Sequence, residues 1–179
     1  MELSEQQSEL LEQFAQGDLS AFEALFRQFQ SEVYRWIMRL VRDPSTAEDL
    51  TIETFWRIYR SRARFDSRRS FGAWARRIAT NAALDYLKTK RPETVELQDF
   101  HASSAANPAI QCDTREHLEQ AFRRLPAKLQ IAAILALVEG QPHQEIAEVL
   151  GISLGAVKLR VFRASRLLRK ELESKGIEP

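Results

Sequence analysis

The sequence predicts an all-α protein made of two small helical domains joined by a flexible linker. Strong helix formers dominate the chain, which has only six Gly and six Pro among its 179 residues. No alternating stretch rich in Val, Ile and Thr predicts a strand. Helical periodicity stops between residues 91 and 110, where Pro92, Pro108 and a small polar run at 102–107 occur. We therefore predict domains over residues 1–92 and 113–179 and a linker over 93–112.

Two helices are expected before residue 42. The first covers residues 4–16 and ends near Gly17. The second begins around Asp18 or Ser20 and runs to Val41, because apolar residues recur through AFEALFRQFQSEVYRWIMRLV at the spacing of one helix face.

Two further helices complete the first domain. The stretch DPSTAEDL can start a helix in two ways: Asp43 can cap it with Pro44 in the first turn, or Ser45 can cap it with Glu48 three residues later. This helix extends to about Arg62, and the loop ARFDSRRS follows. The last helix covers 71–90, with Trp74 expected in the core.

The second domain is expected to contain four helices, over residues 114–124, 127–139, 143–150 and 154–173. Asp113 and Glu116 form a possible capping box at its start. Pro126, the break at 140–142 and Gly151 separate the helices that follow.

The segment HQEIAEVLGISLGAVKLRVFRA, residues 143–164, has the pattern of a helix-turn-helix. Gly151 permits the turn, Ile152 plugs the angle between the helices and Ser153 caps the second helix. Leu154, Val157, Val161, Ala164 and Leu168 are expected to pack on the domain. The opposite face carries Leu159, Arg163, Arg166 and Lys170, with Phe162 and Arg160 beside it. Such a face suits the major groove of DNA better than plain solvent.

The charge of the chain alternates in blocks. Residues 54–92 contain 11 bases and 2 acids, and residues 122–179 contain 10 and 6, whereas residues 1–53 contain 4 and 11 and residues 93–121 contain 1 and 6. Two basic blocks separated by acidic ones predict two surfaces that meet a polyanion.

Other classes of protein are disfavoured. The lone Cys112 and the scattered histidines do not have zinc spacing, and no Walker loop or nucleophile elbow is present, so neither a metal, a cofactor nor an enzymatic activity is expected. The acidic start is unlike a signal peptide, and the longest apolar run, 131–138, is too short for a membrane span. We expect a cytoplasmic protein with no membrane insertion.

The chain resembles bacterial RNA polymerase sigma factors of the extracytoplasmic-function (ECF) type. The resemblance rests on GDLSAFEALFRQF, AEDLTIETFWRIYR, FGAWARRIATNAALDYLKTKR, LPAKLQIAAILALVEGQPHQEIAEVLGIS and AVKLRVFRA, in the family's order. It implies sigma regions two and four, binding to core RNA polymerase at its β′ clamp and β flap, and recognition and melting of promoter DNA. It also implies an anti-sigma factor as a partner.

The resemblance assigns polymerase binding to one helix. The residues implied are Asp49, Ile52, Glu53, Trp56, Arg57 and Arg60. The family usually has Gln where this chain has Ile52, so an apolar contact would replace a hydrogen bond. Alternatively, Glu53 only pairs with Arg57 on the helix surface, which would be a weak interaction.

The basic block that follows resembles the part of the family that reads the minus-ten element as a single strand. Its arginines are interleaved with aromatic residues, as in single-strand binders. The residues implied are Phe65, Asp66, Ser67, Arg68, Arg69, Arg76, Arg77, Lys88 and Arg91.

The last helix would read the minus-thirty-five element as duplex DNA. The residues carried over are Ser153, Lys158, Leu159, Arg160, Phe162, Arg163 and Arg166, with Ser153 as a phosphate contact. Two alternatives stay open. An autonomous helix-turn-helix regulator would bind duplex DNA without polymerase, and a sigma-mimicking module would bind an anti-sigma factor without needing these arginines.

Overall fold

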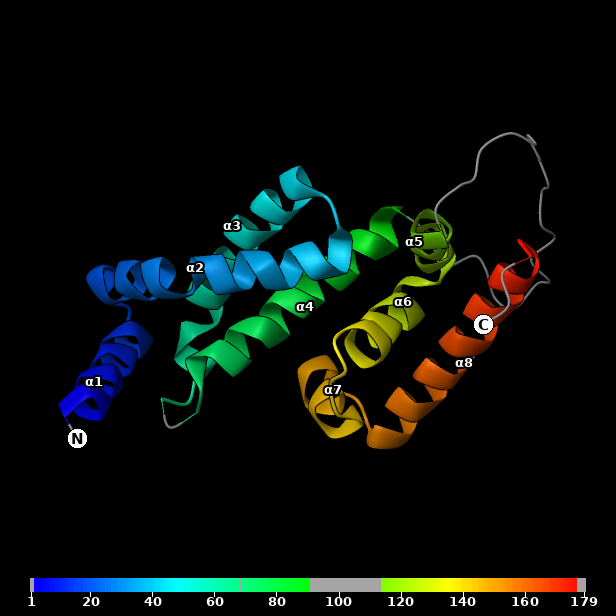
Figure 1. Cartoon of the computed structure of the whole chain (residues 1–179). Coiled ribbons are helices and arrows are strands. Elements are labelled where there is room, and N and C mark those ends of the chain that lie inside the picture. The colour runs from blue at the N-terminus through cyan, green and yellow to red at the C-terminus, as the bar shows by residue number, and fades with distance from the viewer. Residues whose placement is uncertain (1, 68, 91–113, 177–179) are drawn as a thin grey trace.

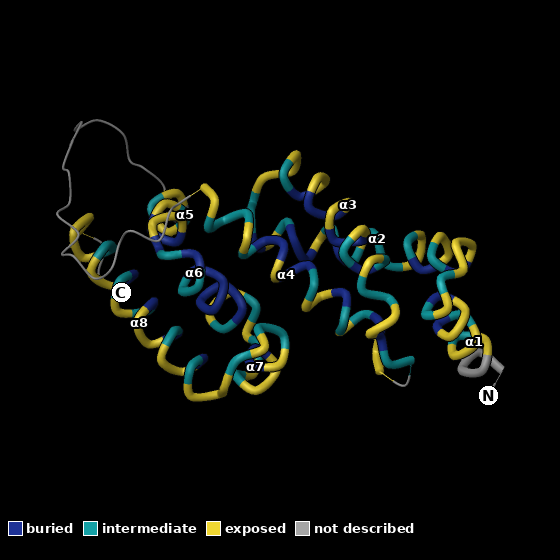
Figure 2. Tube along the Cα trace, turned by 180° about the vertical axis from the view of Figure 1, so that it is seen from behind, coloured by how far each residue is buried: buried dark blue, intermediate teal, exposed yellow. Residues whose placement is uncertain are grey.

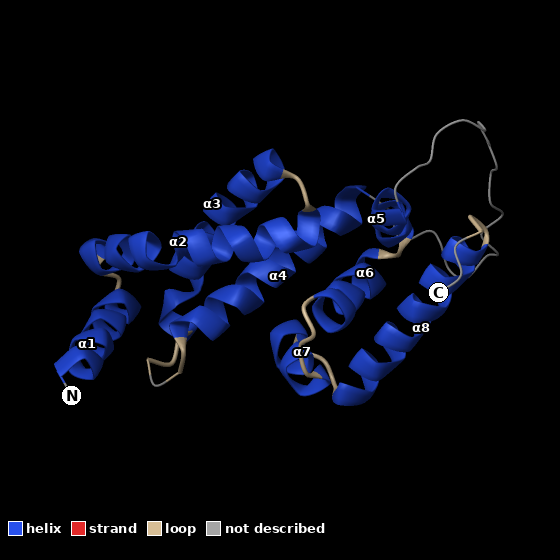
Figure 3. Cartoon of the chain, in the orientation of Figure 1, coloured by secondary structure: helices blue, strands red, loops and turns tan. Residues whose placement is uncertain are grey.

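Helices are the only secondary structure in the part of the chain that the computed structural model describes, residues 2–67, 69–90 and 114–176 (Figures 1 and 3). The first half contains α1 (Glu2–Gln16), α2 (Leu19–Val41), α3 (Pro44–Ser61), the short η1 (Arg62–Arg64) and α4 (Phe71–Lys90). The second contains α5 (Thr114–Arg124), α6 (Ala127–Ala133), η2 (Ile134–Val138), α7 (His143–Leu150) and α8 (Leu154–Glu173). The all-α prediction is confirmed, whereas the predicted linker and Asp113 lie outside the described residues.

Side-chain caps determine where the helices of the first half begin. Asp18 caps α2 by accepting a hydrogen bond of 2.7 Å from the N–H of Ala21. Asp43 caps α3 in the same way, accepting from the N–H of Thr46 over 2.8 Å, and Pro44 occupies the first turn. Of the two starts that the sequence allowed for α3, the structure therefore has the one at Asp43.

Replacing Asp18 by alanine is expected to lower the free energy of unfolding by about 1 kcal/mol, because one N–H group at the start of α2 loses its acceptor. Urea titration followed by tryptophan fluorescence measures the change. Ser20→Ala, at an exposed position in the first turn of α2, is the control. Equal stability of the two variants would show that the cap contributes nothing.

The core of the first half forms where α2, α3 and α4 pack together (Figure 2). Leu25, Ile37 and Ile58 are fully buried there, each contributing about 1.5–3 kcal/mol through loss of contact with water. The buried Trp36 donates its indole N–H to Thr80 Oγ1 over 2.9 Å, so its polar atom stays satisfied inside the core.

An aromatic cluster joins α1 to the segment between α3 and α4. Phe14, at 0% exposure, lies with its ring centroid 5.7 Å from that of Phe71 and 6.2 Å from those of Phe22 and Phe65. Trp74 packs at the edge of the same cluster, with its centroid 4.8 Å from that of Phe65. Helix α1 therefore holds this segment through ring contacts.

In the second half, α6 packs against α8 and, on the side of the first half, against α4. A single α-helix was predicted over 127–139, but η2 is a wider π-helical turn, in which the N–H of Glu139 bonds to the carbonyl of Ile134 over 3.0 Å. The wider turn keeps Ile134 and Leu135 buried and leaves Val138 49% exposed. A regular helix would have carried Val138 to the inner side.

The two halves are in contact. Helix α4 packs against α6 and α7 (Figure 1). Ion pairs also join the halves: Arg39 with Glu139 at 2.5 Å and Arg42 with Glu119 at 3.4 Å. Within the described residues, the two helical halves are therefore in contact through helix packing and ion pairs.

Candidate functional site

The outer face of α3 carries all six residues predicted to bind polymerase. Their spacing of three and four places them on one side of the helix, opposite the buried Leu50, Thr54 and Ile58. Five are exposed and Arg57 is half-buried. The six residues on this face are Asp49, Ile52, Glu53, Trp56, Arg57 and Arg60.

An open apolar groove runs between this face and the start of α2. It is lined by Leu19, Phe22, Phe26, Ile52, Phe55, Trp56 and Tyr59. The exposed fractions of Leu19, Ile52 and Trp56 are 66%, 57% and 58%. Large apolar side chains gathered in the open are unusual on a monomer surface and mark places where another macromolecule binds.

Arg57 links this face of α3 to α4. Its Nε lies 2.9 Å from Glu53 Oε1, and its Nη1 lies 2.8 Å from Asp85 Oδ2 on α4. The hydrogen bond to Asp85, followed by the one to Glu53, raises the pKa of Arg57. The predicted pair of Glu53 and Arg57 is thus present, but Asp85 makes it a bridge between two helices.

The predicted minus-ten loop is divided between buried and exposed residues. Phe65 is only 7% exposed because it packs against Phe14, Phe71 and Trp74, so its ring is not available to a nucleic-acid base. This corrects the expectation that Phe65 touches DNA directly: an aromatic ring of this size is stabilised more by the cluster that α1 completes than by an open loop.

The remaining loop residues lie closer to solvent. Asp66 and Ser67 are half-exposed, and Arg69 is exposed with its Nε 3.7 Å from Asp66 Oδ2. At the base of the loop, the Arg62 guanidinium lies 4.4 Å from the centroid of the Tyr59 ring and donates to the Tyr59 carbonyl over 2.9 Å. The predicted site residues Arg68 and Arg91 lie outside the described part of the chain.

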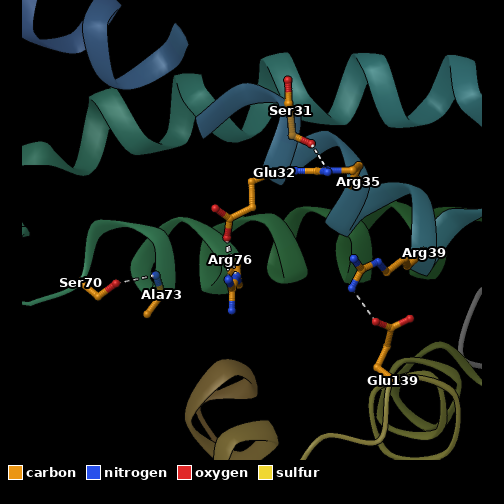
Figure 4. A network of polar contacts seen from close by, with 8 residues as sticks. All are labelled: Ser31, Glu32, Arg35, Arg39, Ser70, Ala73, Arg76 and Glu139. Atoms are coloured by element: carbon orange, nitrogen blue, oxygen red, sulfur yellow. Dashed lines mark hydrogen bonds and ion pairs between the residues drawn. The ribbon is translucent and has the colours of Figure 1, made fainter. Parts of the chain in front are cut away.

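The bases on α4 do not share one environment. Arg76 donates twice to Glu32 Oε1, over 2.9 and 2.6 Å (Figure 4). Arg77 extends instead toward the second half of the chain, where its guanidinium lies against Gly151. Lys88 is half-buried. Two of these three cations therefore contact other parts of the protein rather than solvent alone.

The helix-turn-helix has the geometry that its sequence predicts. Gly151 ends α7 with φ +64°, a conformation that glycine adopts without strain. Ser153 caps α8 by accepting from the N–H of Ala156 over 3.2 Å. Val157, Val161, Ala164 and Leu168 are buried as expected. Leu154 is 37% exposed, because it stands in the first turn of α8 at the rim of the packing face.

The opposite face of α8 points outward. Leu159 and Phe162 are 48% and 66% exposed. Of the remaining predicted residues, Ser153, Lys158, Arg163 and Arg166 are exposed and Arg160 is half-buried. Apolar and cationic side chains thus alternate on the outward face of α8, the second helix of the helix-turn-helix, which in such motifs enters the major groove of DNA.

The described residues contain neither a candidate membrane span nor a candidate metal site. No helix among them is long and apolar enough to cross a membrane. No group of three or more His, Cys, Asp and Glu side chains within residues 2–67, 69–90 and 114–176 has the arrangement of a metal site.

Comparison with known proteins identifies the family. Residues 25–93 match the family described as Sigma-70 region 2, and residues 115–168 match Sigma-70, region 4. The chain is 35% identical over 176 residues to the RNA polymerase sigma factor CarQ of Myxococcus xanthus, covering 94% of this chain and 98% of CarQ. It is also 35% identical over 171 residues to the ECF RNA polymerase sigma factor BldN of Streptomyces coelicolor, covering 92% of this chain and 65% of BldN. The chain belongs to the ECF-type RNA polymerase sigma factors.

As a sigma factor, the protein directs promoter recognition and transcription initiation by RNA polymerase, and it is a non-catalytic subunit of that enzyme. The solved structure of CnrH in complex with the cytosolic domain of CnrY shares the fold, with a TM-score of 0.60 and 23% identity over 93% of this chain and 97% of that chain. Hereafter region 2 means residues 25–93 and region 4 means residues 115–168.

Sequence reasoning missed part of the site. Leu19, Phe22 and Phe26 of α2 line the groove beside Trp56, although the helical period assigned the two phenylalanines to the core alone. Exposure of Leu19 could have been predicted, since it is a large apolar residue in the first turn directly after the Asp18 cap. The Arg57–Asp85 ion pair could not have been predicted, because the partners are 28 residues apart.

Proposed function

We propose that this sigma factor docks on the β′ clamp of core RNA polymerase through the outer face of α3 and the adjoining groove. The observation that carries the proposal is the exposed pair Ile52 and Trp56 on a helix whose other face is buried. Tryptophan is enriched among the residues that dominate binding energy at interfaces. Asp49, Glu53 and Arg60 would form a charged rim. A second contact, between region 4 and the β flap, would hold the other end of the chain.

The loop between α3 and α4 and the exposed side of α4 are proposed to capture the minus-ten element as a single strand. Extruding a base from a duplex costs a few kcal/mol, which contacts to the extruded base must offset. Asp66, Ser67 and Arg69 are accessible for those contacts. Phe65 is proposed to support the loop from beneath, through its contacts with Phe14 and Trp74.

Helix α8 is proposed to read the minus-thirty-five element in the major groove. Arg163 is the strongest candidate for a guanine edge, because it lies on the outward face between the exposed Leu159 and Arg166. Leu159 and Phe162 would contact thymine methyl groups. Lys158, Arg160 and Arg166 would hold phosphates on either side, together with Ser153 at the start of the helix.

Arg163→Ala is expected to weaken binding of the holoenzyme to its promoter by about 1–3 kcal/mol and to relax preference at one base pair of the minus-thirty-five element. Competition binding against single-base variants of the element measures both. The matched control is Arg169→Ala on the same helix, which should weaken binding equally for every sequence. A uniform loss in Arg163→Ala as well would make Arg163 a phosphate contact.

The partners proposed are core polymerase, promoter DNA in duplex and single-stranded form, and an anti-sigma factor. The anti-sigma factor is suggested by the fold shared with CnrH, which is solved with the cytosolic domain of CnrY. We place the protein in the cytoplasm with polymerase, and we propose residues 1–92 and 113–179 as its two functional units.

Co-elution with purified core polymerase tests the docking proposal directly. The chain is expected to elute with core in gel filtration and to protect both promoter elements in footprinting. An autonomous regulator would instead protect duplex DNA without core. A sigma-mimicking module would protect neither promoter element.

A further inference from the structure

Region 4 covers part of the basic surface of region 2. Arg39 Nη1 lies 2.5 Å from Glu139 Oε2, although the two residues are 100 positions apart in the chain (Figure 4). Arg42 Nη1 lies 3.4 Å from Glu119 Oε1 on α5. Both cations belong to the last turn and C-terminal cap of α2, and both acids belong to region 4.

A third arginine of region 2, Arg77, is exposed as a whole but contacts region 4 with its guanidinium. A Cβ atom built on Gly151 would lie 2.9 Å from Arg77 Nη2, so the guanidinium rests directly on the turn of the helix-turn-helix. Arg39, Arg42 and Arg77 thus all contact region 4, each with its guanidinium group. Arg76, next to Arg77, pairs instead with Glu32 inside region 2.

Carboxylate oxygens bind guanidinium groups through the same charge-assisted hydrogen bonds that phosphate oxygens form. Glu139 and Glu119 therefore occupy cations that could otherwise hold a DNA backbone. The side chains of Arg39 and Arg42 remain 49% and 33% exposed, so neither pair is sealed from solvent and each can exchange its carboxylate for another anion.

The contact between the regions is incompatible with simultaneous engagement of both promoter elements. Elements centred about 25 base pairs apart are separated by about 85 Å along B-form DNA. In the structure α4, which carries Arg77, packs directly against α7 of the helix-turn-helix. The regions must therefore separate on the promoter, and separation releases the three guanidinium groups from their contacts with region 4.

We propose that Arg39 and Arg42 join Arg77 in a phosphate-binding surface for promoter DNA, which region 4 shields with Glu139 and Glu119 while the protein is unengaged. The inference rests on the proposed function, because it assumes that regions 2 and 4 bind separate elements. It assigns DNA contacts to the end of α2, and it makes region 4 an internal competitor for them.

Salt dependence of promoter binding by the holoenzyme tests the phosphate-binding role. Each lost phosphate contact should reduce the ratio of affinities at 50 and 200 mM salt by about threefold. Arg39→Gln and Arg42→Gln are each expected to do so, and the double variant about tenfold. Arg27→Gln is the control, since Arg27 lies on the same helix but pairs with Glu23, away from region 4. A salt dependence equal to that of Arg27→Gln in both variants overturns the proposal.

Energy transfer between two labels tests the shielding. With Cys112→Ser as background, Gln28→Cys in region 2 and Glu173→Cys at the end of α8, just beyond region 4, place labels at exposed positions. Transfer should be efficient in the free protein and low in the promoter complex. Glu139→Gln should shift the closed-to-open ratio by up to about fivefold toward open. The double exchange of Arg39→Glu with Glu139→Arg should restore the closed-to-open ratio of the wild type. If it does not, or if the free wild-type protein is already open, region 4 does not shield these arginines.

The outcomes separate this inference from the proposed function. If the wild-type chain does not bind core polymerase, the proposed function itself fails. If the holoenzyme initiates normally while Arg39→Gln and Arg42→Gln retain wild-type salt dependence, only the phosphate-binding surface is refuted.

Discussion

Replacing Trp56 by alanine is expected to weaken binding to core RNA polymerase at least about 30-fold, equivalent to about 2 kcal/mol. The indole is 58% exposed beside Ile52 and Leu19, so the free protein gains little from it, whereas a partner that fills the groove would bury it. Titration of labelled sigma factor with purified core polymerase measures the dissociation constant.

Two comparisons make the Trp56 result specific. Gln28→Ala, at an exposed position of α2 outside the groove, should bind core as the wild type does. Thermal melting of Trp56→Ala should match the wild type within a few degrees, because no core contact is lost. A dissociation constant within threefold of the wild type would remove the groove from the polymerase interface.

Phe14→Ala is expected to lower the free energy of unfolding of the first half by about 3–5 kcal/mol. Phe14 is fully buried and meets Phe22, Phe65 and Phe71, so its loss leaves a cavity between α1, α2 and the minus-ten loop. This is a large part of the stability of a small domain. The minus-ten loop should also lose the support that Phe14 gives it. The holoenzyme should therefore still form but melt promoter DNA less efficiently.

Tryptophan fluorescence is suited to this measurement because all three tryptophans, Trp36, Trp56 and Trp74, lie in region 2. Urea unfolding followed at these indoles therefore reports on the half that contains Phe14. Glu12→Ala, on the exposed side of α1, should change stability by less than about 0.5 kcal/mol. A loss below 1 kcal/mol in Phe14→Ala would show that α1 is not integral to the cluster.

Local sequence signals predicted the helices well because each start or stop is determined by a few neighbouring atoms. Asp43 and Ser153 accept predicted capping bonds, and Asp18, one of the two expected starts of α2, accepts one as well. Gly151 has the positive φ that the turn requires. The outward direction of Leu159 and Phe162 likewise followed from the helical period.

What could not be predicted depends on contacts between distant segments. The sequence places Phe65 in a loop, but it does not predict that α1 brings Phe14 against its ring. The π-helical turn that leaves Val138 exposed within the predicted helix 127–139 has no signal in the helical period. No sequence feature near Arg39 predicts its ion pair with Glu139, which lies 100 residues later in the chain. The period of a helix specifies which side is buried, but not which element buries it.

Transcription in vitro is the most direct test of the central claim that this chain confers promoter selection on core polymerase. Purified core enzyme should produce defined start sites from a set of genomic promoter fragments only when the protein is added. Those starts should be lost with Trp56→Ala and shifted in promoter preference with Arg163→Ala. Transcripts that begin at the same sites with and without the protein would contradict the account.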